Sequence, residues 1–401
     1  MILTLGYIVL FWVFREQSYT GDWKNWTRFI EDGLWYRLRE PICLLIYQIP
    51  YVALRPFGVT GTDVLAGTSC VLGGFSMAYG LAILRLLTPG RHLQILGMTA
   101  LTASYGVSGI FFGHVEHYSV MSLGCFAYLY YALRYIRGRS SVKAPGLVLG
   151  LLLTTHLMAA WLVPSLMLLP YVRSRAGTGS KGGHRDLVWA LLVMGLPNLL
   201  TWFVILAVYY DGSILALIQD GQTGSYSRQR YGGPGNALGG GNTKLFLELS
   251  EILSLRHLQG MLALFILYSP FTLLALPACC VHRGRERFRA LLRPDGLVLL
   301  SLLLPYTIYA FTWEPGRGYV EDWDLFSHTS IFLVFAVLVL VMARPWSRAF
   351  GAVVLSALFL SALGTGYTVV ESHREGLSGV HSVITSMGVS AEKLNSKRRP
   401  R

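Results

Sequence analysis

The sequence predicts an all-α protein, a polytopic transmembrane helical bundle of about eleven spans with amphipathic surface helices in its first external loop. Composition is the first observation behind this prediction. Of the 401 residues, 53% are hydrophobic and only 14% are charged, whereas soluble domains carry about 25% charged residues. The second observation is that apolar runs of roughly 20 residues, the length that crosses a bilayer core, recur along the chain.

The apolar runs place the spans in order along the chain. The stretch 145–172 is too long for one crossing. Thr155 and His156 near its middle, with Pro164 beyond, predict two shorter helices that turn back near His156. The remaining spans are predicted at 2–15, 60–85, 92–112, 117–136, 186–210, 258–280, 295–313, 326–343 and 349–370.

Charges between the spans predict the orientation of the bundle, because short cytoplasmic loops carry an excess of Arg and Lys. With the N-terminus in the cytoplasm, the basic loops lie inside. Of the 21 acidic residues, nearly all then lie outside. The inside acids are Asp186, Glu286 and Asp295, and the basic inside loops are 134–143, 173–185 and 283–293.

The first external segment, 15–59, is predicted to be more than a linker. Within it, residues 22–38 carry aromatic and aliphatic side chains close to helical spacing. That pattern is typical of an amphipathic helix lying on the membrane surface. Residues 41–57 are apolar but interrupted by Pro50, and we interpret them as a second surface helix rather than as a crossing.

A second external segment, 211–257, is rich in Gly, Ser, Gln and Asn. This composition is typical of a mobile loop, and we expect a surface helix at 245–253. The sequence thus divides into one transmembrane bundle, 1–370, and a weakly ordered external tail, 371–401.

The composition also argues against two other classes of protein. The formal net charge is +13, but the basic residues fall between apolar runs rather than along one face, so no nucleic-acid partner is expected. The cysteines show neither metal-ligand spacing nor a disulfide framework. We expect buried thiols at Cys43, Cys70, Cys125, Cys279 and Cys280.

The first group of candidate functional residues follows the first span. Asp22 lies a few residues beyond it, with Glu31, Asp32 and Glu40 following. A carboxylate at this position is well placed to act as a general base at the membrane surface. The alternative is that Asp22 caps the amphipathic helix, as Asp before a helical pattern often does.

The second group lies in the turn before residue 118. His114, Glu116 and His117 resemble metal ligands, but one short turn seldom supplies three converging ligands. We therefore favour a polar contact from Glu116 and His117 to a substrate or an arginine. His156 is predicted at the same outer face, where the alternative is a structural hydrogen-bonding role.

The third group precedes the span at 326–343. Asp322 and Asp324 have the D-x-D form that can hold a divalent cation against a phosphate. Arg317 can form a bidentate contact to a phosphate oxygen. A salt bridge between Arg317 and a neighbouring acid is an equal alternative.

The layout resembles the GT-C superfamily of polyprenyl-phosphate-sugar-dependent membrane glycosyltransferases. The residues that carry the resemblance are Thr20-Gly21-Asp22-Trp23 after the first span, Arg39-Glu40-Pro41 before the next helix, and the short helices around Thr155 and His156. The architecture is similar to that of protein mannosyltransferases, in an uncharacterised bacterial branch. The sequence departs from better-known members in lacking a sizeable external domain and a paired acid in the first loop, which leaves the acceptor and any metal requirement open.

The resemblance implies an inverting glycosyltransferase in a bacterial inner membrane, with its active site facing the periplasm or exterior. Asp22 would act as general base on a glycan, lipid or protein acceptor. Arg317, with Arg228 or Arg230, would hold the donor phosphate. Asp322 and Asp324 would position Arg317 or bind a divalent ion, Mg²⁺ or Mn²⁺.

Two other functions are alternatives. A polysaccharide polymerase or ligase also uses lipid-linked sugars and external arginines, but the early Asp22 favours the transferase. A polytopic transporter would place ionisable residues near the bilayer midplane and show repeated halves. The sequence shows few charges within spans and no internal repeat.

Overall fold

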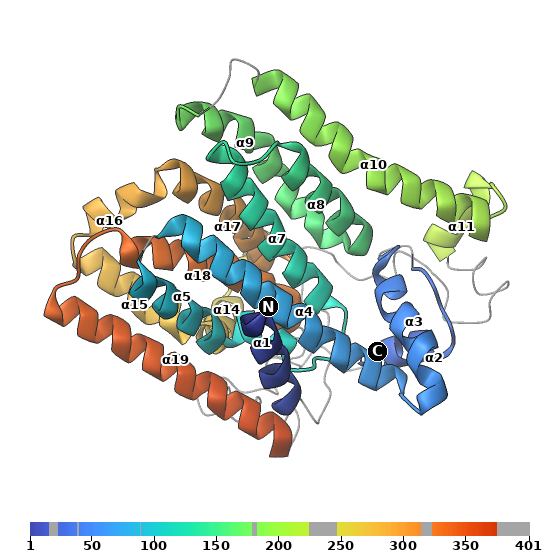
Figure 1. The fold of residues 1–401 in the computed structure, drawn as a ribbon, viewed down its shortest axis with the longest axis horizontal. Helices are drawn as coiled ribbons and strands as arrows, with labels where there is room; N and C mark the ends of the chain where they lie inside the picture. Colours follow the sequence, from blue (N-terminus) through green and yellow to red (C-terminus); the bar gives the residue numbers. More distant parts are fainter. Residues whose placement is uncertain are drawn as a thin grey trace.

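The computed structural model describes residues 1–15, 23–37, 40–88, 90–178, 183–223, 247–313 and 323–374, and every regular element within these ranges is a helix (Figure 1). The all-α fold class is therefore confirmed. The first half contains α1 (Ile2–Val13), α2 (Trp23–Glu31), α3 (Cys43–Leu54), η1 (Arg55–Phe57), α4 (Gly61–Leu87), α5 (Arg91–Ala103), α6 (Tyr105–Ser108), η2 (Gly109–Phe111), α7 (Tyr118–Ile136), α8 (Lys143–Thr155), η3 (Leu157–Leu162) and α9 (Val163–Arg175).

The second half is helical in the same way, and its long helices flank the first half. In Figure 1, α10 runs along one edge of the molecule beside α8, and α19 runs along the opposite edge beside α15 and α5. These helices are α10 (Gly183–Tyr209), α11 (Ile214–Thr223), α13 (Leu249–Ile252), α14 (Leu255–Tyr268), α15 (Pro270–Val281), α16 (Gly284–Leu291), α17 (Pro294–Thr312), α18 (Trp323–Met342) and α19 (Arg348–Arg374).

Five of the described helical segments are long and apolar enough to cross a bilayer, or six if α14 and α15 form one bent span. The chain is thus a multi-pass membrane protein. Each predicted span coincides with a helix or with consecutive helices. The count of about eleven crossings is not confirmed, because α1 and α8 are apolar but shorter than a bilayer core.

Two spans predicted as continuous are broken, at Ser104 and at Ser269. The predicted span 92–112 ends its first helix at Ala103, and Ser104 has extended backbone angles. In the predicted span 258–280, Pro270 follows the break and cannot donate a backbone hydrogen bond. The helices on either side of Ser269 are bent by 98°. Apolarity predicts a membrane span but does not predict whether its helix continues.

Hydroxyl groups replace the backbone hydrogen bonds that the break at Ser104 removes. The hydroxyls of Ser104 and Ser269 lie 3.0 Å apart, so the two breaks contact each other in the core. The carbonyl of Ala103 accepts hydrogen bonds from Ser361 and Thr365 of α19. A broken helix is tolerated at membrane depth only when neighbouring groups satisfy its backbone in this way.

Close packing of α8 against α10 fixes the direction of α8. Gly146 and Gly150 face the backbone of α10. A Cβ atom at Gly146 would lie 2.8 Å from the Ala190 carbonyl oxygen, and a Cβ atom at Gly150 would overlap the Met194 carbonyl oxygen. Asn198 donates to the Gly150 carbonyl at 3.2 Å. Small residues four apart permit this approach of two helices in a membrane.

The two helices predicted within residues 15–59 are confirmed as α2 and α3, although α2 ends at Glu31 rather than near residue 38. Trp26 and Ile30 are buried against the bundle. Gln48 of α3 donates to the Ile30 carbonyl at 2.9 Å. Glu31 accepts from the backbone amide of Gly61, at the start of α4, at 3.1 Å. The predicted surface helix at 245–253 is shorter and forms the single turn α13.

Ion pairs join the loops that the sequence predicts to be cytoplasmic. Each of the three acids assigned to that side contacts an arginine. These pairs are Arg137 with Asp295, Arg173 with Asp186 at 3.6 Å, and Arg344 with Glu286 at 3.3 Å. The basic loops and their acids therefore lie at one face of the bundle, as the charge pattern predicts.

Replacing Gly150 by Ala tests the α8–α10 contact. We expect G150A to lower the free energy of unfolding by about 1–3 kcal/mol, because the added methyl group overpacks the interface. Gly195 of α10 has nothing within 4 Å of its Cβ position, so G195A is the matched control. Thermal unfolding in detergent measures both variants, and an equal midpoint for G150A and the wild type would contradict the packing argument.

Candidate functional site

The first component of the site is Glu40, which lies between α2 and α3. Its side chain is only 7% exposed, and one carboxylate oxygen lies 3.3 Å from the guanidinium of Arg37. That guanidinium lies over the rings of Phe29 and Trp26, at 4.6 and 5.4 Å. Burying a carboxylate is costly unless it is paired, and Arg37 supplies the compensating charge.

His117 is the second component, and it ends the turn before α7. Gly113 begins this turn with φ +72°, and a Cβ there would lie 2.7 Å from the Cβ of Arg15, so glycine is required. The His117 ring stacks on Trp26 of α2 with ring centroids 4.2 Å apart. Neither ring nitrogen hydrogen-bonds to any residue that the structure describes.

The buried position of His117 determines its charge. Burial lowers the pKa of His117 well below its usual range, and the neighbouring His156 and Arg37 lower that pKa further. The imidazole is therefore neutral near pH 7. A neutral imidazole keeps one ring nitrogen with a lone pair, which can accept a hydrogen bond or bind a metal ion.

His156 is the third component, and it ends α8 with an extended backbone, φ −160° and ψ 132°. Its Nδ1 accepts a hydrogen bond from the backbone amide of Met158 at 3.0 Å. The neutral ring therefore carries its proton on Nε2. The rings of His156 and His117 stack with centroids 4.9 Å apart.

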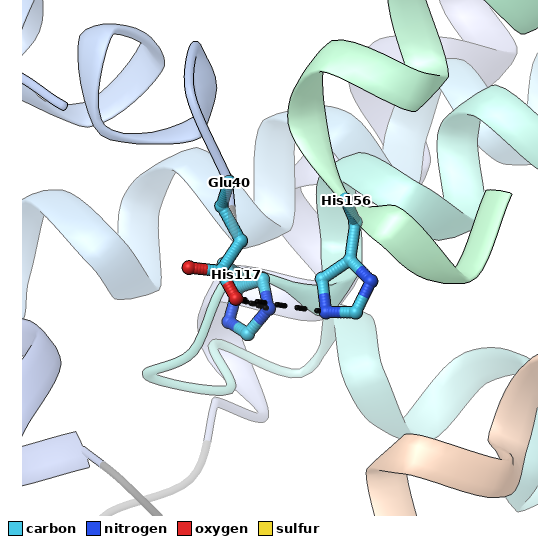
Figure 2. Close-up of side chains that lie close together, drawn as sticks. All are labelled: Glu40, His117 and His156. Carbon is cyan, nitrogen blue, oxygen red and sulfur yellow. Dashed lines mark ion pairs between the residues drawn. The ribbon is translucent and has the colours of Figure 1, made fainter. Parts of the chain in front are cut away.

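These three side chains form what we call the triad, Glu40, His117 and His156 (Figure 2). One carboxylate oxygen of Glu40 lies 4.0 Å from Nε2 of His117 and 3.9 Å from Nε2 of His156. One potential ligand atom from each residue lies within 4.8 Å of those of the other two, close enough for the three to be considered as ligands of one metal ion. The triad joins three segments that are far apart in the sequence.

Backbone and side-chain contacts hold these segments together around the triad. The amide of Ile42, at the start of α3, donates to the Thr154 carbonyl near the end of α8 at 2.9 Å. Tyr36 in the first external loop donates to Tyr210 beyond the end of α10 at 3.1 Å. The predicted external ends of α8 and α10 therefore both contact the first loop.

A series of ring contacts extends from the first loop to α18. The Trp26 ring stacks on His117, the His117 ring contacts Tyr118 at 4.3 Å, and the Tyr118 ring contacts His328 of α18 at 5.9 Å. Separately, the amide of Leu247 donates to the Thr312 carbonyl at 2.8 Å. Leu247 follows the segment that carries Arg228, and Thr312 precedes the segment that carries Arg317, so these two neighbours lie side by side.

The structure brings together two of the predicted site residues, His117 and His156. Glu116 lies in the same turn and is 4% exposed, but it is not part of the triad. The other predicted residues cannot be placed. Asp22, Arg228, Arg230, Arg317 and Asp322 lie outside the described residues, and Asp324 lies in the first turn of α18 without a described side chain.

Sequence reasoning named Glu40 among the external acids but did not select it as a site residue. The signal in the sequence is an acid immediately before an apolar helix, in Arg39-Glu40-Pro41. The turn before residue 118 does not supply all three groups of the triad. The turn supplies one ring, and two other segments supply the remaining groups.

No protein-family model matches the sequence, and no curated protein matches it. Two crystal structures of ArnT from Cupriavidus metallidurans, one in the apo state and one bound to undecaprenyl phosphate, share its fold. Their TM-scores are 0.56 and 0.57, and each match covers 97% of this chain and 74% of ArnT at 12% identity. The fold is therefore GT-C-like, as the sequence resemblance predicts.

Replacing Trp26 by Ala tests how α2 is held beside the triad. We expect W26A to destabilise the protein by about 3–5 kcal/mol, because a buried aromatic ring is lost. Amide hydrogen exchange should then accelerate across Trp23–Glu31. Trp35 in the same loop is 38% exposed, so W35A is the control and should leave this exchange unchanged. Unaltered protection of α2 in W26A would show that the stacking does not anchor the helix.

Proposed function

We propose that this chain is an integral membrane glycosyltransferase that moves a sugar from a polyprenyl-phosphate donor to an acceptor on the non-cytoplasmic face. One observation carries the proposal. The GT-C-like fold extends over 97% of the chain and is shared with ArnT, which has been crystallised with undecaprenyl phosphate. In this proposal, residues 1–370 form the catalytic unit.

The positions of the polar groups support this assignment. In the part of the chain that the structure describes, the buried triad lies at helix ends rather than at the middle of a span. A transporter would place ionisable groups near the bilayer midplane. An enzyme acting on a lipid headgroup requires its polar groups at the level of that headgroup, where a lipid-linked sugar and a water-soluble acceptor can meet.

Asp22 is the proposed general base. It immediately precedes α2, the helix whose Trp26 stacks on His117. Asp22 would accept the proton of the acceptor hydroxyl, and the hydroxyl oxygen would attack the anomeric carbon opposite the leaving phosphate. This in-line displacement inverts the configuration at that carbon.

Negative charge grows on the leaving phosphate during this displacement, so nearby cations stabilise the transition state. Arg317, with Arg228 or Arg230, would bind that phosphate. Asp322 and Asp324 would position Arg317 or hold a divalent ion, Mg²⁺ or Mn²⁺. The contact between Leu247 and Thr312 supports this grouping, because these residues follow and precede the segments that carry the arginines.

Replacing Asp22 by Asn tests the base. We expect D22N to reduce transfer from a radiolabelled polyprenyl-phosphate sugar by about 10²–10⁴-fold, because the amide cannot accept the proton. Asp32 in the same loop is exposed and pairs with Arg28, so D32N is the matched control and should retain activity. Transfer by D22N at the wild-type rate would remove Asp22 from the mechanism.

Chemical labelling tests the proposed sidedness. Ser213 and Arg285 are both exposed, and they lie in segments predicted on opposite faces. In a background in which the exposed Cys280 is replaced by Ala, we expect S213C to react with a membrane-impermeant maleimide in intact spheroplasts. R285C should react only after the membrane is permeabilised. The reverse pattern would place the triad in the cytoplasm and exclude a periplasmic or exterior active site.

A further inference from the structure

We propose that Glu40, His117 and His156 bind one Zn²⁺ ion through a carboxylate oxygen and the two Nε2 atoms, and that this ion fastens the first external loop to the bundle. Its three ligands differ from Asp322 and Asp324, the residues of the D-x-D motif. The inference does not depend on glycosyl transfer, because it concerns metal content and the attachment of a loop.

The distances are close to those of a zinc site. Ligands bound to tetrahedral zinc at about 2.0–2.2 Å lie roughly 3.3–3.6 Å from one another. The Glu40 oxygen lies 4.0 Å from Nε2 of His117 and 3.9 Å from Nε2 of His156. Each of these two distances therefore has to shorten by well under an ångström for zinc to bind. Figure 2 shows the three side chains converging from different segments.

His117 provides the observation that points to a ligand. The ring is 5% exposed, and neither nitrogen hydrogen-bonds within the described residues. Buried polar atoms are almost always satisfied, and a ring with two unsatisfied nitrogens calls for an explanation. A metal–nitrogen bond at Nε2, the atom directed at Glu40, satisfies the ring at the position where the structure holds it.

The donor set favours zinc over magnesium. Two imidazole nitrogens and one carboxylate are typical zinc ligands, and three protein ligands leave a fourth position for water. Mg²⁺ prefers oxygen ligands and keeps several waters, so it fits this triad poorly. Arg37 contacts the other Glu40 oxygen, which orients the carboxylate.

Binding requires one rearrangement at His156. In the structure its Nδ1 accepts from the Met158 amide, which leaves the ring proton on Nε2. To offer a lone pair at Nε2, the ring must carry its proton on Nδ1 and give up that hydrogen bond. Zinc binding thus exchanges one neutral hydrogen bond for a metal–nitrogen bond, and it should loosen the Met158 amide.

The proposed role follows from where the ligands come from. Glu40 belongs to the first external loop, His117 begins α7 and His156 ends α8. An ion bound by all three ties the loop to two helices of the bundle. In this proposal the ion holds α2 and α3 in place, and its fourth position stays open to water.

Metal analysis of the purified full-length protein tests the proposal. We expect about one zinc ion per chain in the wild type, measured by plasma mass spectrometry after excess zinc is removed. Zinc should also raise the thermal unfolding midpoint of metal-stripped protein. Less than about a tenth of an ion per chain after reloading with zinc would overturn the proposal.

Three variants separate metal binding from other roles. H117F keeps an aromatic ring against Trp26, and E40Q keeps the size of Glu40. H156N keeps a side-chain acceptor for the hydrogen bond from the Met158 amide, since Asn caps helices well. Each of these three variants should bind zinc at least tenfold more weakly than the wild type. The exposed His184 supplies the control, and H184A should bind zinc normally. Equal zinc binding by H156N and H184A would contradict the assignment of His156.

Cobalt substitution decides the result if a variant fails to fold. Wild-type protein stripped of metal and reloaded with Co²⁺ should give the intense visible absorption of a four- or five-coordinate site. A weak, octahedral spectrum would overturn the proposal without recourse to any variant. Hydrogen exchange in the wild type adds a second readout, because the Met158 amide should exchange faster with zinc than without it.

Discussion

The requirement that every backbone polar group be satisfied inside the hydrocarbon governs this structure. It accounts for the absence of strands in the described residues, and it dictates what happens where a helix breaks. At Ser104 the chain leaves helical geometry, and the carbonyl of Ala103 is satisfied by hydroxyls of α19 instead. The same requirement favours polar side chains at helix ends. There the helical hydrogen bonding stops, and a side chain such as His156 can accept a hydrogen bond from a free backbone amide.

The polar groups separate into two faces with different chemistry. At one face, arginines pair with the few acids of the basic loops, as in the contact of Arg137 with Asp295. These pairs are partly exposed, so each contributes little to stability. At the other face, a carboxylate and two imidazoles are nearly buried. Burying such groups costs free energy. Ionisable groups kept at the end of a helical bundle despite this cost point to a role in binding or catalysis.

The sequence predicts those features that depend on one segment at a time. The spans 60–85 and 117–136 were located within two residues of α4 and α7, because apolar length is a local property. The break at Ser269 was missed, since it depends on Pro270 and on a partner hydroxyl from Ser104. The triad was missed as a unit for the same reason: its three groups come from separate segments, and their proximity is set by packing such as that of α8 on α10. Asp22 and the arginines stay predictions, because they lie outside the described residues.

The hydrogen bond from Ile42 to Thr154 has a consequence for biogenesis. The ribosome synthesises the first external loop long before α8, so Glu40 and the start of α3 wait in water until more than a hundred further residues have been translated. Docking of α2 and α3 against α8 therefore has to follow the synthesis of α7 and α8, although α2 and α3 come first in the chain. Until then the Ile42 amide has no Thr154 carbonyl to donate to, so this part of the site is completed out of the order in which it is translated.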